Sequence, residues 1–257
     1  MAVNAWQVIS QSHCGNVRKI NEDAVLALTQ PLLLAIADGM GGHQAGDIAS
    51  QMLITNLARL NRKVDLESNI SGVKDAIMAS NESILDYSKS QLNGQTVGTT
   101  IVTMLSDCTQ ASCLWAGDSR LYRLRNNHLE QLTQDHSYVA ELIKTGQLEA
   151  KDAFKHPSSN IITRSVGVES SLSLDQIRFD ILAQDTFLLC SDGLYDEIEE
   201  SELIQAMQVY DIYRGSNWLL NLSLGRAAKD NVSFIIARAV DDNQTDLHST
   251  TLTNFSD

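Results

Sequence analysis

The chain has few basic residues, few cysteines and no long apolar run. Its 257 residues include 19 Lys and Arg against 32 Asp and Glu, which gives a formal net charge of -13. A protein with this acidic excess is repelled by nucleic-acid backbones and by anionic membrane surfaces. The composition therefore predicts no nucleic-acid partner and no membrane partner, and it favours cations in any acidic cleft.

Cysteine spacing and hydropathy bear on the location of the protein. Cys14, Cys108, Cys113 and Cys190 lack the C-x2-C spacing of a zinc site, so we expect reduced, mostly buried thiols. The N-terminal "MAVNAWQVISQS" lacks the basic flank and apolar core of a signal peptide. No later stretch reaches the ~20 apolar residues that span a bilayer. These absences predict a soluble, cytoplasmic protein.

Short apolar runs bounded by Gly, Asp, Asn and Ser predict strands. They cover residues 31–38, 98–105, 111–118, 120–125, 177–182, 185–192 and 231–240. Apolar residues at helical spacing predict helices over residues 46–63, 65–91, 199–210 and 215–228. Strands and helices do not alternate strictly, so an α+β sandwich is favoured over a parallel doubly wound sheet.

The domain organisation follows from the distribution of apolar residues. We expect a single compact domain over residues 1–240, with no internal repeat and no low-complexity linker. Residues 137–160 have short helical patterns without a strand and are predicted to run over the surface. Residues 241–257 are polar and are predicted to be a disordered or loosely packed C-terminal tail.

Four aspartates stand where a predicted strand meets a loop: Asp38, Asp118, Asp192 and Asp230. One Asp-Gly or Asp-Asn pair alone is an ordinary turn. Four at strand ends favour a shared site, where crowded carboxylates repel one another unless cations intervene. Oxygen ligands suit Mg2+ or Mn2+, and two such ions can lower the pKa of a shared water and present it as a hydroxide nucleophile. That chemistry suits hydrolysis at phosphorus.

Two further segments bear on the same site. The stretch "GNVRKINEDA" joins Arg18 to Glu22 and Asp23; Arg18 is either a phosphate-binding fork or a surface partner of Glu22. The glycine-rich "DGMGGHQAGDIAS" does not follow the P-loop pattern and has no Lys at the helix start, so a nucleotide site is not expected. Its glycines instead let the backbone approach a metal, with the carbonyl of Gly39 as a ligand.

Eight motifs in order resemble the metal-dependent protein Ser/Thr phosphatases of the PPM family, often called type 2C, and especially their compact bacterial members. They are "GNVRKINEDA", "AIADGMGGHQAG", "GTTIVT", "WAGDSRLYRL", "LTQDHS", "HPSSNIITRSVG", "LLCSDGLYD" and "KDNVSFIIARA". The resemblance covers residues 7 to 240, nearly the whole chain. It implies a central β-sandwich of two antiparallel sheets flanked by helix pairs, in four layers α-β-β-α, with residues 137–160 as a flap beside the active site.

The resemblance also implies roles for the site residues, with two Mn2+ or Mg2+ ions and a weaker third. Asp38 would bridge two metals, the Gly39 carbonyl would bind one, and Asp192 and Asp230 would bind the other. Glu22 or Asp23 would act through water or by supporting a ligand. Asp118, Asp192 and Asp196 match the weaker third site, and Arg18 matches the phosphate-binding arginine.

The chain departs from the family at two places. Many relatives have Gly-Gly where this chain has Ala227 and Ala228; if the loop needs a positive φ there, the alanines strain it and put the position of Asp230 in doubt. Eukaryotic relatives place a His directly after the Asp-Gly, where Met40 stands here. His156 in the flap, His43 or a metal-bound water could then protonate the leaving oxygen.

The sequence therefore predicts a monomeric protein-serine/threonine phosphatase of signal transduction, opposing a bacterial Ser/Thr kinase. A metal-bridging water or hydroxide would attack phosphoserine and phosphothreonine in line, without a covalent phosphoenzyme. One alternative is a catalytically silent relative that binds phosphoproteins as a regulatory module. Another is an enzyme whose main substrates are small phosphate esters.

Overall fold

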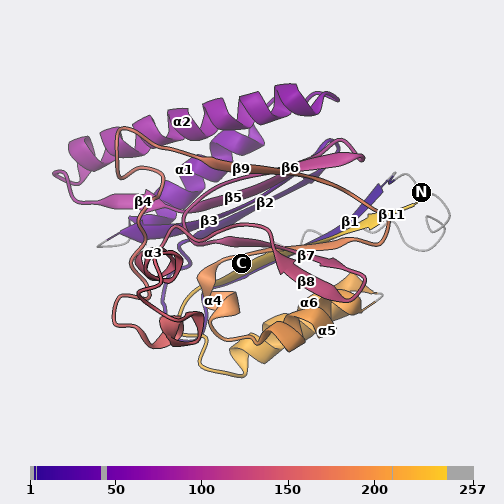
Figure 1. Ribbon diagram of the computed structural model, residues 1–257. Helices are drawn as coiled ribbons and strands as arrows, with labels where there is room; N and C mark the ends of the chain where they lie inside the picture. The colour runs from indigo at the N-terminus through magenta and orange to yellow at the C-terminus, as the bar shows by residue number, and fades with distance from the viewer. Residues whose placement is uncertain (1–2, 4, 42–44, 210, 242–257) are drawn as a thin grey trace.

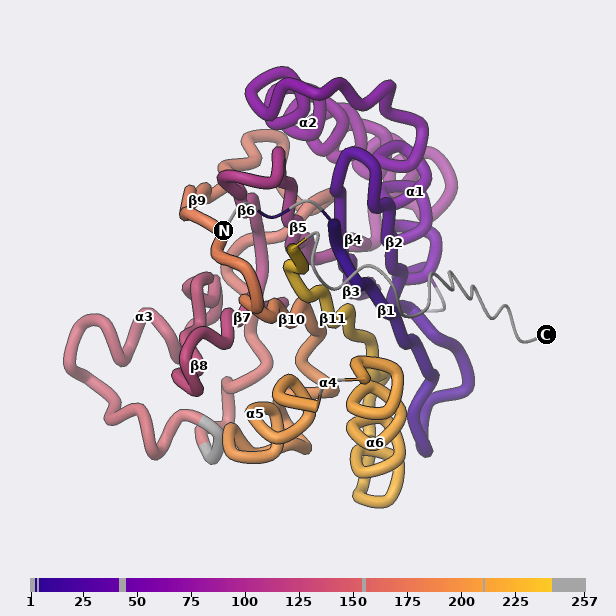
Figure 2. The backbone as a smooth tube through the Cα atoms, turned by 90° about the vertical axis from the view of Figure 1, so that its right-hand side faces the viewer, coloured from indigo at the N-terminus to yellow at the C-terminus, as the bar shows by residue number. Residues whose placement is uncertain are grey.

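The computed structural model describes residues 3, 5–41, 45–209 and 211–241. In this part of the chain, two antiparallel sheets lie face to face, and helices cover their outer sides (Figure 1). The view turned by 90° shows the same layers, with α1 and α2 on one side and α5 and α6 on the other (Figure 2). The fold is therefore the predicted α+β sandwich with the layer order α-β-β-α.

Each sheet combines strands from distant parts of the chain. In spatial order, the first sheet contains β1 (Ala5–His13), β11 (Val232–Val240), β10 (Thr186–Cys190), β7 (Arg120–Arg125) and β8 (His128–Gln131). The second sheet contains β2 (Asp23–Thr29), β3 (Leu32–Gly41), β5 (Ile101–Ser106), β6 (Gln110–Ala116) and β9 (Asp175–Asp180). The short β4 (Val97–Thr99) pairs with the end of β3, beyond β5.

In the described residues, helices cover both sheets, lie in the flap or follow β10 directly. The second sheet is covered by α1 (Gly46–Ala58) and α2 (Leu66–Gln91), and the first by α5 (Glu200–Gln208) and α6 (Ile212–Leu224). The flap holds α3 (Tyr138–Lys144) and the 3-10 turn η1 (Ala150–Lys155). The single-turn α4 (Asp192–Tyr195) follows β10 directly.

Alternating side chains of the central strands build three hydrophobic cores. In β3, Leu34 points into the core between the sheets, whereas Leu33 packs beneath α1 and α2. In β11, Ile235 lies between the sheets and Phe234 packs beneath α5 and α6. Because successive side chains of a strand point to opposite faces, a strand covered on both faces needs an unbroken apolar run. The central strands could therefore be predicted from their apolar runs in the sequence.

Some elements differ from the prediction. The edge strands β1 and β8, together with β2 and α4, were not predicted; the side chains of β1 are almost all partly exposed, so it lacks the apolar run. The helix predicted over 46–63 ends at Ala58. The helix predicted over 215–228 runs from Ile212 to Leu224, because the Asp211 carboxylate caps it by accepting the Tyr213 N–H.

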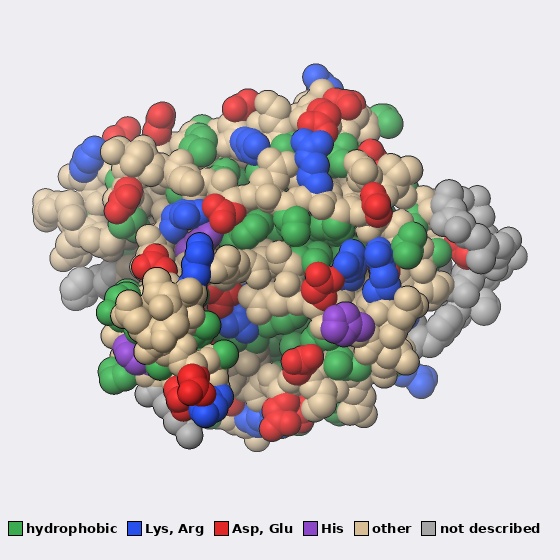
Figure 3. Space-filling model, viewed as in Figure 1, with side chains coloured by type: hydrophobic (Ala, Val, Ile, Leu, Met, Phe, Trp, Pro, Cys, Tyr) green, Lys and Arg blue, Asp and Glu red, His purple; other side chains and the backbone are tan. Residues whose placement is uncertain are grey.

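The outer surface carries charges of both signs. Acidic and basic side chains are interspersed on the face shown in Figure 3. In the described ranges no helix has the length and apolarity needed to cross a membrane. The predicted tail lies outside the described residues from 242 onward, so the domain boundary at residue 240 stays a prediction.

Candidate metal centre

The predicted aspartates come together at one end of the sandwich. Asp38 lies near the end of β3, Asp118 follows β6, Asp192 begins α4, and Asp230 stands two residues before β11. Asp38 and Asp192 each affect the pKa of the other. The charges of Asp118, Asp192 and Asp230 all act on Asp38. The strand ends therefore form one acidic cluster.

Hydroxyl groups hold the backbone at Asp38. Its N–H donates to Thr100 Oγ1 at 3.0 Å, and its carbonyl accepts from the Thr100 N–H at 2.8 Å and from Thr99 Oγ1 at 2.9 Å. The hydroxyls of Thr100 and Ser119 lie 2.7 Å apart. Since Ser119 directly follows Asp118, one pair of hydroxyls fixes the loops of two clustered aspartates.

Gly39 lies where three segments meet. A Cβ on this residue would lie 2.1 Å from the Gly46 carbonyl oxygen and 2.6 Å from the Glu22 carbonyl oxygen. The Gly39 N–H donates to the Glu22 carbonyl at 3.1 Å, and the Gly46 N–H donates to Glu22 Oε1 at 3.2 Å. Glycine at 39 therefore lets β3, the Glu22 loop and the start of α1 approach one another, and a larger residue would force them apart.

Burial and mutual repulsion control the protonation of the central pair. Burial raises the pKa of Asp38 well above its ordinary value, and the charges of Asp23 and Asp192 add to the effect. Burial also raises the pKa of Asp192, with Asp230 as the next contributor. Carboxylates behave in this way when they are crowded together without counter-ions. The cluster therefore favours cations or protons.

Asp23 and Asp118 each bury an oxygen that lacks a hydrogen-bond partner. This holds for Oδ1 of both residues within the described chain. The other oxygen of Asp23 accepts from the Ser191 hydroxyl at 2.9 Å. Burial raises the pKa of Asp23 and of Asp118 to about 7 each. A buried ionised oxygen without a partner is costly, and a divalent cation or its water would relieve that cost.

Asp196 lies one turn after Asp192. Its N–H donates to the Asp192 carbonyl at 2.9 Å, and part of the residue's surface is open to solvent. Partial burial, followed by the charge of Asp192, raises the pKa of Asp196 to about 6. Asp118 and Asp192 repel each other in the same way. The three residues predicted for a weaker third ion are therefore neighbours.

Arg18 pairs with Asp230 rather than with Glu22. Its Nη2 lies 2.7 Å from Asp230 Oδ2, and this hydrogen bond is the main cause of its raised pKa. The charge of Glu22 contributes less. The Arg18 side chain is 51% exposed. A guanidinium at this position can therefore meet a ligand from solvent while it stays beside the acidic cluster.

The residues present fit hard divalent cations, although the protein groups alone do not complete a site. Among the residues that the structure describes, no three His, Cys, Asp or Glu side chains have the arrangement of a finished metal site. Mg2+ and similar ions usually bind one or two carboxylates and keep several waters. The neighbouring Asp38 and Asp192, the Gly39 carbonyl and the unpartnered Oδ1 atoms of Asp23 and Asp118 suit such a partly hydrated site.

The loop before Asp230 shows the predicted strain at one alanine. Ala228 has a φ of +36°, whereas Ala227 does not enter the left-handed region. Ala228 is fully buried, and its carbonyl accepts the Asn16 N–H at 2.8 Å. The loop thus holds an alanine at a positive φ, at a cost of about 1 kcal/mol or more.

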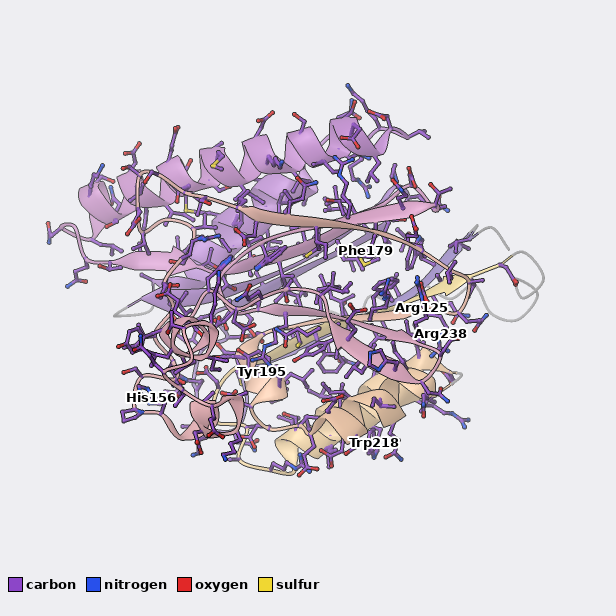
Figure 4. All side chains as sticks on the ribbon, viewed as in Figure 1. Arg125, His156, Phe179, Tyr195, Trp218 and Arg238 are labelled. Atoms are coloured by element: carbon purple, nitrogen blue, oxygen red, sulfur yellow. The ribbon has the colours of Figure 1, made fainter. Side chains whose placement is uncertain are left out.

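The two histidines among the candidate proton donors are His156 and His43. His156 lies in the flap, at the edge of the molecule in Figure 4, where its Nδ1 accepts the Ser158 N–H at 3.1 Å. Its ring packs on Tyr138, also in the flap, with ring centroids 6.2 Å apart. These contacts are local, so its catalytic role stays a prediction. His43 lies outside the described residues.

A second network, which the sequence did not predict, joins β7 and Asp135 to the acidic cluster. Arg120 binds both oxygens of Asp135 through Nε, donates to the Tyr122 hydroxyl at 2.9 Å and stacks on the Tyr195 ring at 3.5 Å. The Tyr195 hydroxyl donates to the Asp118 carbonyl at 3.2 Å. Arg120 and Asp135 lie in the motifs "WAGDSRLYRL" and "LTQDHS". These motifs could therefore have pointed to both residues from the sequence.

Sequence comparison assigns the chain to a family. The family model described as "Protein phosphatase 2C" matches residues 11–217. The serine/threonine protein phosphatase PstP of Mycobacterium tuberculosis is 34% identical over 235 residues, which cover 90% of this chain. The chain spans only 45% of that relative's length.

Solved structures agree with the sequence match. PppA, described as a key regulatory component of T6SS in Pseudomonas aeruginosa, superposes with a TM-score of 0.86 at 40% identity, covering 93% of this chain and 100% of that one. The catalytic domain of PstP in complex with two manganese ions superposes with a TM-score of 0.83 at 32% identity, covering 92% and 99%. With its sandwich, its acidic cluster and these matches, the chain belongs to the protein phosphatase 2C family.

Proposed function

We propose that this protein hydrolyses phosphoserine and phosphothreonine in other proteins with the help of divalent cations. The observation that carries the proposal is the cluster of carboxylates around Asp38 and Asp192, with the exposed guanidinium of Arg18 beside it. Acid side chains gather cations, and an arginine fork binds phosphate oxygens. The two together fit a phosphate monoester that would otherwise be repelled by the acids.

The carboxylates are proposed to hold two Mn2+ or Mg2+ ions. Asp38 would serve both ions, the Gly39 carbonyl would help to hold one, and Asp192 and Asp230 would hold the other. When bound, the two ions neutralise the cluster and activate water for attack on phosphorus. Glu22 and Asp23 act through water or by supporting the ligands, and the raised pKa of Glu22 from burial favours such an indirect role.

A weaker third ion is proposed beside the first two. The charge of Asp192 acts on both Asp118 and Asp196, whose pKa values are raised to about 7 and about 6. Asp196 is exposed, so this position exchanges readily with solvent. Ready exchange is what a weakly held ion requires.

Arg18 is proposed to bind the phosphate and to stabilise charge on its oxygens. When substrate binds, the Arg18 side chain must either break its ion pair with Asp230 or bind the phosphate while keeping that pair. Its 51% exposure permits this movement. The planar fork holds two phosphate oxygens at once and so orients the ester for in-line attack. Loss of Arg18 is therefore expected to weaken substrate binding more than turnover.

The leaving oxygen needs a proton, and His156 is proposed as its donor. A histidine titrates near neutral pH and can carry that proton. The flap that holds His156 would have to bring it to the substrate, since its present contacts lie within the flap. His43 and a water molecule are the other two candidates.

The proposed substrates are phosphorylated proteins, with a bacterial Ser/Thr kinase acting in the opposite direction. PppA of Pseudomonas aeruginosa is described as a regulatory component of T6SS, and this supports a regulatory phosphoprotein as the target. We further propose that the protein acts as a cytoplasmic monomer in signal transduction. The binding-module alternative is disfavoured because the acids and Arg18 remain together at one site.

The proposal is tested with a phosphothreonine peptide and chelator-stripped protein, with and without millimolar Mn2+. Activity should require Mn2+, vanish in Asp38→Ala and show a raised KM in Arg18→Ala. Arg214→Ala changes an arginine that is 83% exposed on α6 and should behave as the wild type. A folded, metal-loaded wild type that leaves the peptide intact would favour the binding module, and a preference for small aryl phosphates in kcat/KM would favour the small-ester alternative.

A further inference from the structure

Asn231 is a buried amide between the loop that carries Arg18 and the loop that carries Asp230. Its residue is 4% exposed. Its Oδ1 accepts the Glu22 N–H at 2.8 Å. Its Nδ2 donates to the carbonyls of Cys14 at 3.1 Å and Ile20 at 3.0 Å. All the hydrogen-bonding groups of this amide therefore point into the loop between β1 and β2.

The two carbonyls that Asn231 binds lie on either side of Arg18. Cys14 is four residues before Arg18, and Ile20 is two residues after it. The NH2 group of Asn231 thus holds the backbone on both sides of Arg18 in place. The Oδ1 atom of the same amide holds the backbone of Glu22. The exposed Arg18 side chain can move, but the backbone from which it extends is tied to Asn231.

The main chain of Asn231 reaches the other acidic loops. Its N–H donates to Asp230 Oδ1 at 2.9 Å, which orients that carboxylate. Its carbonyl oxygen packs against α4, where a Cβ on Gly193 would lie 2.0 Å away. Gly193 directly follows Asp192, so glycine at this position lets the Asp192 turn approach the same residue. Asn231 therefore contacts the segments of Glu22, Asp230 and Asp192.

Asn16 repeats the link at the surface. Its Nδ2 donates to the Leu224 carbonyl at 2.8 Å and, at 3.3 and 3.4 Å, to the carbonyls of Arg226 and Ala227. Its N–H donates to the Ala228 carbonyl at 2.8 Å. The neighbouring Gly15 has a φ of +75° and packs where a Cβ would lie 2.2 Å from the Asp230 carbonyl oxygen. The Arg18 loop and the Asp230 loop are thus joined from inside and outside.

We propose that Asn231, supported by Asn16, is a positioning residue that locks the Arg18 loop to the Asp230 loop and so couples phosphate binding to cation binding. The inference rests on the proposed function for its kinetic part. Without the amide, the Glu22 N–H and two carbonyls lose their buried partners, and water or a loop shift must replace them. Either response moves Glu22 and Arg18 away from Asp230, and small displacements of this kind weaken both metal and substrate binding.

Asn69 provides a matched control, because it is also a buried amide that joins two loop groups. It is 8% exposed, accepts the Lys63 N–H at 2.8 Å and donates to the Lys63 carbonyl at 2.7 Å. These bonds lie at the end of α1 opposite Gly46, and a helix of 13 residues is ~20 Å long. Asn69→Ala therefore removes a similar buried link far from the acidic cluster.

The first experiment measures Mn2+ binding by calorimetry, without substrate, in the wild type, Asn231→Ala and Asn69→Ala. Both variants should lose thermal stability. Only Asn231→Ala should bind Mn2+ ~10–100-fold more weakly. Equal Mn2+ affinity in all three proteins would overturn the inference, whether or not the protein proves to be a phosphatase.

The second experiment measures KM for a phosphothreonine peptide at saturating Mn2+. Asn231→Ala should raise KM in the wild-type background and should add little in an Arg18→Ala background, since its effect acts through Arg18. If the two substitutions raised KM independently, so that their effects multiplied in the double variant, the coupling would be contradicted. If Asn231→Ala does not fold, both measurements are repeated with Asn16→Ala, which changes an exposed residue. Smaller increases in the Mn2+ dissociation constant and in KM would support the lock. Unchanged values of both would refute it.

Discussion

Arg120 illustrates how one side chain supports the site without belonging to it. Its guanidinium binds the carboxylate of Asp135, the hydroxyl of Tyr122 and the face of Tyr195 at the same time. Tyr195, labelled in Figure 4, is the last residue of α4, the turn that begins with Asp192 of the acidic cluster. Only a planar group with several fixed N–H directions can make these contacts together.

Replacement of Arg120 by lysine is therefore expected to lower the free energy of unfolding by about 2 kcal/mol, although the charge is kept. Arg123→Lys is the control on the same strand, because Arg123 pairs with Glu130, whose side chain is 45% exposed. It should cost about 0.5 kcal/mol or less. Urea unfolding measures both. Equal losses would mean that the geometry of Arg120 is unimportant.

Ala228 makes a testable exception to the rule that glycine destabilises a loop. Ala228→Gly would remove the cost of a positive φ, about 1–2 kcal/mol. The substitution would also destabilise the protein in two ways. The unfolded chain would gain conformational entropy worth about 0.5–1 kcal/mol, and the folded state would lose a buried methyl group worth about 0.8 kcal/mol. We expect the free energy of unfolding to stay within about 0.5 kcal/mol of the wild type.

Ala227→Gly is the neighbouring control, because Ala227 is exposed and has no positive φ to relieve. It should lose about 0.5–1 kcal/mol, since only the entropy cost applies. Thermal unfolding of the two variants side by side distinguishes them. If Ala228→Gly proves the less stable of the two, Ala228 is not strained in the folded loop.

At the scale of elements, the flap contributes few side chains to the hydrophobic core. From α3, only Val139 is buried. His136 ties the start of the flap to the sandwich: its Nδ1 accepts the Gly117 N–H at 3.1 Å, and its ring stacks on Trp115. Its carbonyl accepts the Thr163 N–H at 2.8 Å, which joins the two ends of the flap.

Limited trypsin digestion should therefore cut first at the exposed Lys144 and Lys151 of the flap, because segments with few buried contacts open most often. His136→Ala should accelerate these two cuts, whereas His128→Ala, on the edge strand β8, should not. Mass spectrometry of early fragments identifies the sites. First cuts within β7 or β10 would contradict the view that the flap opens before the sandwich.

Features that depend on neighbouring residues in the sequence could be predicted, whereas features that depend on residues far apart in the chain could not. The central strands and the aspartates at their ends were predictable, because apolar runs and turn residues are local signals. Asn231 was not, because its partners Cys14, Ile20 and Glu22 lie more than 200 residues away along the chain. The pairing of Arg18 with Asp230 rather than Glu22 is likewise a product of the tertiary fold.

At the scale of the whole molecule, the formal net charge of -13 adds to the repulsion within the acidic cluster. The cluster is therefore a place where stability is given up for cation binding. Asp23 and Asp118 show this most clearly, because burial raises each pKa from 3.8 to about 7. A protein of this kind should respond to protons and to metal ions in opposite ways.

The stability of the metal-free protein should fall as pH rises. Between pH 4 and pH 7, the folded state holds protons on Asp23 and Asp118 that the unfolded state has released. The free energy of unfolding therefore decreases over this window, and the contribution is lost once pH passes about 7. Thermal unfolding of chelator-treated protein from pH 5 to pH 8 measures this trend.

Mn2+ should reverse the dependence, because a cation competes with the protons and binds best where the carboxylates are ionised. The rise in Tm on adding millimolar Mn2+ should thus be larger at pH 8 than at pH 5. Asp23→Asn removes one of the titrating groups and should flatten the metal-free profile, whereas Asp86→Asn, exposed on α2, should leave it unchanged. A metal-free protein that becomes more stable toward pH 8 would mean that the acidic cluster is already neutralised by the chain itself.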